Sequence, residues 1–167
     1  SSRQRADMRD SQPDLVEIIL GVACNVEPGA MLGYLGGRRI PDETLRIGSG
    51  ARIRCGTVIY AGSTIGAGLE TGHNVVIREE NVIGDHLNIW NSSTIDYGCQ
   101  IGNNVKIHCN VYVAQFTILE DEVFLAPGVI IANDPHPLCG LCMRGPTIKR
   151  GARIGVNATL LPHITIG

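Results

Sequence analysis

The sequence has few aromatic residues, almost no net charge and no long apolar run. Aromatic side chains make up 4% of the 167 residues and all hydrophobic types 44%, so any core must be aliphatic. A formal net charge of -2 argues against a nucleic-acid-binding surface. No apolar run approaches the roughly eighteen residues of a membrane-spanning helix, and the N-terminus lacks the apolar segment of a signal peptide. We therefore expect a cytoplasmic protein that binds neither nucleic acid nor membrane.

What is present is a branched aliphatic residue at every sixth position from Ile47 to Ile131, with Thr71 as the one exception. Four positions after each comes a second small or apolar residue, and only Asn81 interrupts this second series. A helix needs a period near 3.6, which excludes it here. Because six is even, positions i and i+4 point the same way in an extended strand, so both series can face one interior. The chain therefore reads as a repeat protein.

A slower period of eighteen residues is marked by Gly48, Gly66, Gly84 and Gly102, with Glu120 at the next place. Three units of six predict a three-sided coil whose equivalent corners stack, each coil rising by roughly 4.8 Å. Gly and Asn at the corners suit turns that need positive φ. A β-sandwich would show irregular strand spacing and two-residue Asn-Gly turns, and neither is present. The sequence predicts an all-β, three-sided parallel β-solenoid.

The length favours a single domain, which we place at residues 15–167 after a flexible tail at 1–14. Residues 15–26 should form a first strand that covers the open end of the solenoid. Residues 35–43 should form an external loop, whose two arginines could meet an acidic ligand. The six-residue series stops after Ile131.

Residues 132–147 contain three prolines and no six-residue pattern, and the series resumes at Ile148, Ile154, Leu160 and Ile166. We expect an insertion there, and loops that leave a rigid scaffold often carry binding groups. The sequence ends in the middle of a repeat, so we expect a longer natural chain or another surface over that end.

Six cysteines include a CxxC pair, Cys139 and Cys142, within the insertion. A zinc site would need a second such pair or histidines at ligand spacing, and His136 alone does not supply it. A redox motif would need a thioredoxin-like βαβ context, which is absent. We expect free thiols in a reducing compartment and no metal site.

The eighteen-residue period sorts the outward residues into three corners. They are the glycine corner (66–68, 84–86, 102–104, 120–122), the arginine corner (78–80, 96–98, 114–116) and the histidine corner (72–74, 90–92, 108–110, 126–128). In the arginine corner, Arg78 and Asp96 are equivalent positions and can form an exposed pair worth about 0–1 kcal/mol. The histidine corner gathers two of the five histidines, the only tryptophan and three asparagines, which no turn requires together. This corner is the candidate site.

Its residues suggest roles in group transfer. His73 can act as a general base near neutral pH. Asn74 and Asn110 can donate amide hydrogens to an oxyanion, Asn91 can hydrogen-bond a substrate, and Trp90 offers a flat face to a sugar or base. The alternative is that Asn serves only the turn and that a corner histidine is simply solvated.

The repeat resembles the left-handed parallel β-helix of the hexapeptide-repeat acyltransferases, and the handedness comes from this resemblance alone. The runs TGHNVVIREENVIGDHLNIWNSSTIDYGCQIGNNVKIHCNVYVAQFTILEDEVFLAPGVIIANDPHP (71–137) and GPTIKRGARIGVNATLLPHITIG (145–167) are more specific. They resemble nucleotide-sugar N-acetyltransferases, which acylate an amino group on a nucleotide-linked sugar.

The resemblance implies a homotrimer with acetyl-CoA in the cleft between subunits. The residues that it assigns to acetyl-CoA are Ala132, Asn133, Lys149, Arg150, Gly151, Ala152, Val156 and Ala158. Those that it assigns to the nucleotide sugar are Arg78, Glu79, Trp90, Asn91, His108, Asn110 and Gln115. His73 or Asn74 would orient or deprotonate the amine. His136 is a rival base, because its ANDPHP context is similar to a loop of sugar O-acetyltransferases.

Three other functions stay open. A γ-class carbonic anhydrase would use His73 and His108 as zinc ligands, but the third ligand position is Val113. A non-catalytic scaffold would need no site. O-acetyl transfer to a simple sugar or antibiotic would use the same fold.

Overall fold

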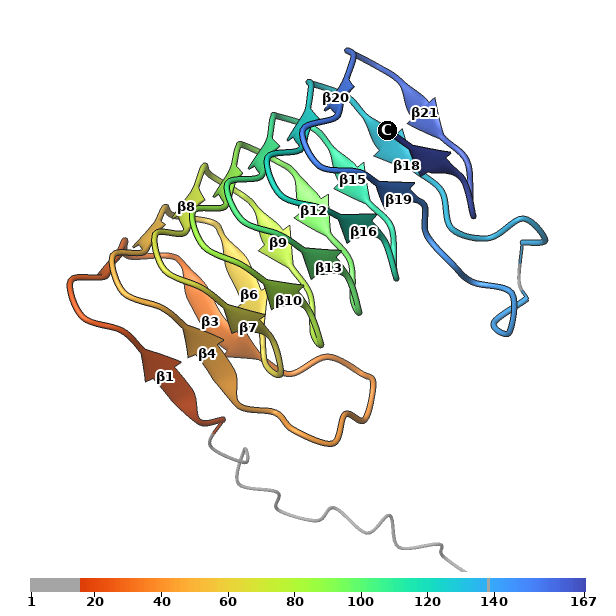
Figure 1. The fold of residues 1–167 in the computed structure, drawn as a ribbon. Coiled ribbons are helices and arrows are strands. Elements are labelled where there is room, and N and C mark those ends of the chain that lie inside the picture. Colours follow the sequence, from red (N-terminus) through yellow and green to blue (C-terminus); the bar gives the residue numbers. More distant parts are fainter. Residues whose placement is uncertain (1–15, 138) are drawn as a thin grey trace, which may run out of the picture.

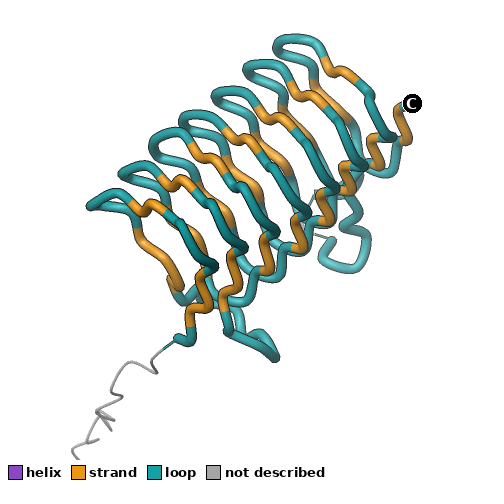
Figure 2. The backbone as a smooth tube through the Cα atoms, turned by 60° about the vertical axis from the view of Figure 1, so that its left-hand side comes forward, coloured by secondary structure: helices purple, strands orange, loops and turns teal. Residues whose placement is uncertain are grey.

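The computed structural model describes residues 16–137 and 139–167, so the tail expected at 1–14 lies outside the described residues. Successive strands of the chain belong to three parallel sheets in strict rotation. The sheets form the sides of a prism, and the coils stack along its axis (Figures 1 and 2). This is the left-handed parallel β-helix that the sequence predicts. The part of the chain that the structure describes contains no helix long and apolar enough to cross a bilayer.

The strands are short, and most contain two residues. In order along the first sheet they are β1 (Ile18–Leu20), β4 (Leu45–Ile47), β7 (Thr64–Ile65), β10 (Val82–Ile83), β13 (Gln100–Ile101), β16 (Ile118–Leu119), β19 (Thr147–Ile148) and β22 (Thr165–Ile166). In the second sheet they are β2 (Asn25–Val26), β5 (Arg52–Ile53), β8 (Glu70–Thr71), β11 (Asn88–Ile89), β14 (Lys106–Ile107), β17 (Phe124–Leu125) and β20 (Arg153–Ile154). In the third they are β3 (Met31–Tyr34), β6 (Val58–Tyr60), β9 (Val76–Ile77), β12 (Thr94–Ile95), β15 (Tyr112–Val113), β18 (Ile130–Ile131) and β21 (Thr159–Leu160).

The pairing register confirms the eighteen-residue period and locates its two interruptions. Val82 pairs with Gln100, eighteen residues on. Ile18 pairs with Leu45 across the first loop, and Ile118 pairs with Thr147 across the insertion. Two expectations are wrong in detail. Residues 16–26 form two strands on different sheets, because a turn follows Leu20, and both extend their sheets. Thr147 lies in β19, so the insertion ends one residue earlier, at 146.

The two series of the sequence pattern fill the interior. The members from Ile47 to Ile131 are buried, as are Ile148, Ile154 and Leu160, and burying one such aliphatic side chain contributes about 1.5–3 kcal/mol. Both exceptions are buried and hydrogen-bonded. The Thr71 hydroxyl accepts from the backbone N–H of Arg54 at 3.0 Å. The Asn81 amide donates to the Arg78 carbonyl at 2.8 Å and accepts from the N–H of Cys99 at 2.8 Å.

The three corners lie where the sequence places them. The glycine corner joins the first sheet to the second, the histidine corner joins the second to the third, and the arginine corner joins the third to the first. Figure 1 shows that the loop at residues 35–44 and the insertion at residues 132–146 leave the coil on the same side. Both connect a third-sheet strand to a first-sheet strand, so both open the arginine corner.

The expectation of free thiols is wrong for one pair. Cys139 and Cys142 form a disulfide, because the tight turn of the insertion brings their Cα atoms to 5.5 Å, within the usual disulfide range. Cys24, Cys55, Cys99 and Cys109 are free.

Candidate functional site

The histidine corner stacks as the sequence predicts, but its asparagines hold the turns together. His73 and Asn91 occupy equivalent positions on adjacent coils, and the backbone N–H of His73 donates to Oδ1 of Asn91 at 2.8 Å. The same bond recurs in the glycine corner, where Ala67 donates to Asp85 and Asp85 donates to Asn103, each at 2.8 Å. The side-chain oxygen of Asn91 therefore takes part in a row of hydrogen bonds that joins equivalent turns of successive coils.

Asn74 and Asn110 are also turn residues. Their φ angles are 55° and 57°, in the left-handed region that Asn tolerates better than most residues. His108 lies half-buried, and its Nδ1 accepts from the N–H of Cys109 at 2.9 Å. Trp90 is half-buried. The ring of His73 is exposed, and its Nδ1 lies 3.3 Å from Sγ of Cys55.

The arginine corner contains two buried carboxylates. Glu79 is 2% exposed and Asp96 is 6% exposed. Arg78 donates to Glu79 through Nε at 3.0 Å and Nη2 at 2.9 Å, and its Nη1 lies 3.2 Å from Asp96 Oδ1. The predicted Arg78–Asp96 pair is confirmed, but the expectation that it is exposed is wrong, because the corner folds over Asp96.

Arg38 reaches this corner from the loop at residues 35–44. It lies 3.1 Å from Glu79 and 2.9 Å from Glu80, and its guanidinium stacks 3.7 Å above the ring of Tyr97. Burial opposes the charge on Glu79, but the backbone N–H of Glu79 and the two guanidinium groups outweigh it, so the pKa of Glu79 is lowered. The sequence suggested that Arg38 could meet an acidic ligand; in the structure its partners are the carboxylates of Glu79 and Glu80, which fix the loop to the coil.

Asp96, the other buried carboxylate of the arginine corner, is linked to the insertion by hydrogen bonds. Its Oδ2 accepts from the Tyr112 hydroxyl at 2.8 Å and from Gln115 Nε2 at 2.7 Å. Gln115 Oε1 accepts from Asn133 Nδ2 at 2.7 Å. Burial and the hydrogen bond to the Asp96 carboxylate raise the pKa of Tyr112, so its hydroxyl remains a donor at neutral pH. One hydrogen-bonded network, the Arg38–Asn133 network, thus links the first loop to the insertion.

A polar column lies inside the coil directly beneath the arginine corner. Every second-series position that leads into the first sheet within the regular coils is polar or thiol-bearing, namely Ser63, Asn81, Cys99 and Thr117. Each donates to a corner carbonyl: Ser63 and Asn81 to Arg78, and Cys99 and Thr117 to Ala114. These bonds fix the backbone that carries the Arg38–Asn133 network.

The remaining predicted cofactor residues lie in the last coil, after the insertion. Lys149 pairs with Glu120 and Arg150 pairs with Asp121, each at 2.8 Å. Lys149 and the backbone N–H of Arg150 lower the pKa of Glu120. Gly151 lies at a turn with φ 70°, Ala152 and Ala158 pack against the core, and Val156 is exposed on the histidine corner. A groove of about 460 Å³ on the first sheet is lined in part by Val82, Ile118 and Arg150.

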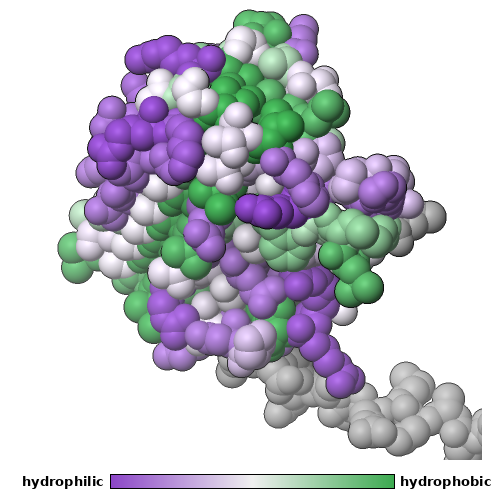
Figure 3. All heavy atoms as spheres, turned by 45° about the vertical axis from the view of Figure 1, so that its right-hand side comes forward, coloured by the Kyte–Doolittle hydropathy of each residue, from purple (hydrophilic) through white to green (hydrophobic). Residues whose placement is uncertain are grey.

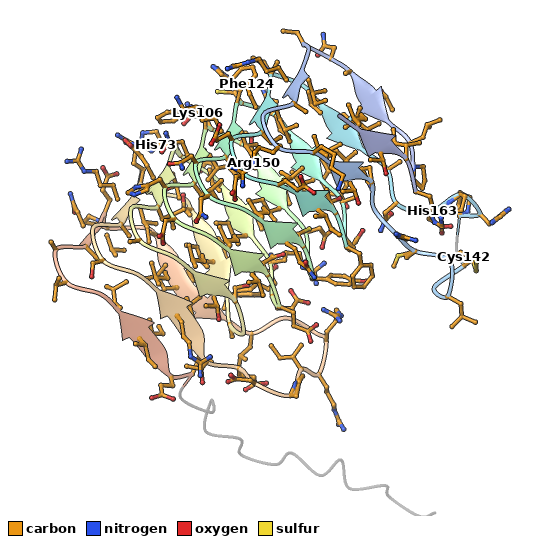
Figure 4. All side chains as sticks on the ribbon, viewed as in Figure 1. His73, Lys106, Phe124, Cys142, Arg150 and His163 are labelled. Carbon is orange, nitrogen blue, oxygen red and sulfur yellow. A yellow bond between two sulfur atoms is a disulfide. The ribbon has the colours of Figure 1, made fainter. Side chains whose placement is uncertain are left out.

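The predicted site residues therefore do not meet within one chain. The histidine corner carries seven of them, while Arg78, Glu79, Gln115, Ala132, Asn133 and His136 lie at the arginine corner or on its insertion. In Figure 4, His73 and Cys142 of the insertion lie on opposite sides of the prism, and Figure 3 shows hydrophobic side chains scattered among hydrophilic ones. Tyr97 and Tyr112 were not predicted, and Asp96 was predicted only as the exposed partner of Arg78.

Comparisons with known proteins agree with this architecture. Residues 98–133 match the family described as bacterial transferase hexapeptide (six repeats). No curated protein sequence matches the chain. Among solved structures, it is similar to LpxA, a UDP-N-acetylglucosamine acyltransferase from Bacteroides fragilis, with 16% identity, a TM-score of 0.34, and coverage of 90% of this chain and 67% of that chain. The family match therefore covers about a fifth of the chain, and the coils on either side of residues 98–133 repeat the same three-sheet geometry.

Proposed function

We propose that the chain is an acyltransferase that moves an acetyl group from acetyl-CoA to the amino group of a nucleotide-linked amino sugar. The hexapeptide match supports a transferase in general, and the segment that it covers, residues 98–133, runs through the arginine corner. The amine acceptor, the nucleotide and the acetyl donor are our inference from the sequence resemblance and from the charge of this corner.

The observation that carries the proposal is the charge of the Arg38–Asn133 network. It contains three carboxylates, Glu79, Glu80 and Asp96, against two guanidinium groups, Arg38 and Arg78. An excess of one negative charge at a partly buried corner favours a cationic acceptor, and a sugar amine is an ammonium ion at neutral pH. A hydroxyl acceptor would gain nothing from this charge.

His136 is the base that we assign to the reaction. It is exposed on the insertion, three residues after Asn133, and the N–H of Arg144 donates to the Asn133 carbonyl at 2.8 Å to close the base of that loop. The imidazole would take a proton from the ammonium group, and the free amine would attack the thioester carbonyl. The first proton passes from the imidazole to solvent, the C–S bond breaks, and the CoA thiolate takes up the second proton, which the nitrogen loses as the amide forms. His73 and Asn74, the first choice from the sequence, remain a prediction.

Lys149 and Arg150 would hold the CoA phosphates. They are exposed, and each is already paired with a single carboxylate of the glycine corner, so a phosphate can share or replace that partner. In the predicted homotrimer, acetyl-CoA would lie between subunits.

Two measurements test the proposal. Acetyl-CoA and a panel of nucleotide-linked amino sugars should each raise the melting temperature, because a ligand that binds the folded state stabilises it by mass action. Thiol release should then follow only when a sugar carries a free amine. Turnover with hydroxyl acceptors alone would indicate an O-acetyltransferase, and no stabilisation by acetyl-CoA would indicate a scaffold.

Single variants assign the base. His136→Ala should lower turnover by about 100-fold or more, within the range of general-base catalysis. His86→Asn is the matched control, because His86 lies on the glycine corner at φ 59°, a conformation that Asn accepts. Full turnover in His136→Ala with loss in His73→Asn would return the role to the histidine corner.

A further inference from the structure

Three side chains of metal-ligand type stack at the N-terminal end of the histidine corner. Glu27, Cys55 and His73 come from three successive coils, and one ligand atom of each lies within 4.8 Å of the other two. Cys55 Sγ lies 3.3 Å from His73 Nδ1. In a tetrahedral zinc site with bonds of about 2.3 Å to sulfur and 2.0 Å to nitrogen, those two atoms are about 3.5 Å apart.

These side chains do not serve the turn in the way that their neighbours do. At the equivalent place on the next coil, Asn91 accepts the backbone N–H of His73. His73 has no such bond to Cys55, whose N–H instead donates to Glu27 Oε2 at 3.0 Å, from the coil on the other side. The carboxylate is thereby held next to the sulfur, while the imidazole faces the sulfur from the opposite coil.

The neighbouring cation does not compete for the site. Arg54 precedes Cys55, but its guanidinium donates to the Thr71 carbonyl at 2.7 Å and lies 3.4 Å from Glu70. The guanidinium of Arg54 therefore points along the second sheet, where the carboxylate of Glu70 balances its charge. Among the described residues, no arginine or lysine forms an ion pair with Glu27.

We propose that Glu27, Cys55 and His73 bind a divalent transition-metal ion, with Zn²⁺ the best fit to one sulfur, one nitrogen and one oxygen ligand. Binding releases the thiol proton of Cys55 to solvent, and the thiolate and carboxylate then balance the two positive charges. Cys55 and His73 are exposed, so the fourth position is open to water or a ligand. This differs from the sequence expectation of no metal site, which weighed the CxxC pair of the insertion and the pairing of His73 with His108.

Cobalt is the sharpest probe, because a thiolate ligand gives Co²⁺ a charge-transfer absorption that oxygen and nitrogen ligands do not. The full chain, stripped with a chelator, is titrated first with Co²⁺ and then with Zn²⁺. We expect one Co²⁺ per chain with that absorption, its loss as Zn²⁺ displaces Co²⁺, and a higher melting temperature with Zn²⁺. Absence of the absorption at one equivalent overturns the proposal.

The variants separate this site from the other thiols. Cys55→Ser should abolish the absorption, and His73→Asn, which installs the residue found one coil on, should weaken Zn²⁺ binding by about 100-fold or more. Cys109→Ser is the matched control, because Cys109 occupies the equivalent corner position two coils after His73 and should leave binding unchanged. A Cys139→Ser, Cys142→Ser double variant should also leave it unchanged. Survival of the absorption in Cys55→Ser, or its loss in either control, assigns the metal elsewhere and refutes the site.

Discussion

Replacing Glu79 with glutamine tests whether the Arg38–Asn133 network holds the first loop to the coil. Glu79 is 2% exposed and accepts three guanidinium hydrogen bonds, from Arg78 Nε at 3.0 Å, Arg78 Nη2 at 2.9 Å and Arg38 Nη1 at 3.1 Å. Glutamine keeps the shape but carries no charge, and its amide group turns a donor toward one of the guanidinium groups.

The expected loss is about 2–4 kcal/mol at pH 7. Hydrogen bonds to charged groups contribute about 1.5–3 kcal/mol each, against about 0.5–1.5 kcal/mol for neutral ones, and three are weakened here. Breaking a fully buried pair costs about 3–5 kcal/mol. The two arginine side chains are 27% and 36% exposed, so water can solvate them once the carboxylate is lost, which lowers the figure.

The destabilisation caused by Glu79→Gln should become smaller at low pH. The pKa of Glu79 is lowered in the folded state, so its stabilisation is complete above the unfolded value near 4.3 and disappears as the pH falls through the folded value. Urea unfolding at a series of pH values from 7 down to 3 should therefore show a constant gap between wild type and Glu79→Gln above about pH 5.5. Below about pH 4 the gap should narrow.

Glu80→Gln is the matched control, since its side chain is 35% exposed and, among the described residues, pairs with Arg38 alone, at 2.9 Å. It should cost no more than about 1 kcal/mol. Trypsin should also cleave after Arg38 or Arg39 faster in Glu79→Gln than in the control, because the loop loses its anchor. Equal losses in the two variants, or a gap that persists to the lowest pH, would refute the reasoning.

Three further predictions concern individual turns and side chains. Gly98→Ala should cost about 1–3 kcal/mol in urea unfolding, because Gly98 has φ 71° and a Cβ there would lie 2.8 Å from the Phe116 ring, whereas Gly37→Ala meets no atom within 4 Å and should be near neutral. Burial raises the pKa of Cys99 to about 12, so iodoacetamide at pH 8 should alkylate exposed Cys55 and spare Cys99 until the protein unfolds; equal rates by mass spectrometry would contradict this. Lys149→Ala with Arg150→Ala should weaken acetyl-CoA binding by about tenfold in calorimetry, with an unchanged melting temperature; unchanged affinity would place the CoA phosphates elsewhere.

The fold could be predicted because the repeat is set by local geometry. Six residues make one side of the prism, so the two series identify the buried positions from Leu45 to Ile131 without reference to distant contacts. The same period places Arg78 beside Asp96 and Asn91 above His73, and both contacts are present. Within the regular coils, stacking is therefore readable from spacing alone.

Sequence spacing does not predict the contacts of residues that lie in, or are shifted by, a loop outside the regular coils. Glu27 lies beside Cys55 although twenty-eight residues separate them, because the loop at residues 35–44 lengthens that coil. Arg38 returns to Glu79 from an irregular loop whose path no period describes. Residue type alone does not separate turn residues from site residues: the asparagines of the histidine corner also serve its turns, since Asn91 accepts the N–H of His73 and Asn74 and Asn110 have positive φ.

The polar column lies beneath the corner that both loops open. A buried backbone group left without a partner costs about 1–3 kcal/mol. Ser63 and Asn81 donate to the Arg78 carbonyl, and Cys99 and Thr117 donate to the Ala114 carbonyl, so the regular turns between the two loops are held by side-chain hydrogen bonds. The insertion returns directly over Thr117, so closely that a Cβ on Gly145 would lie 2.6 Å from the Thr117 backbone. The coil is thus built to vary at one edge while the other two keep their register, which makes the arginine corner the place where a substrate site can be built without disturbing the fold.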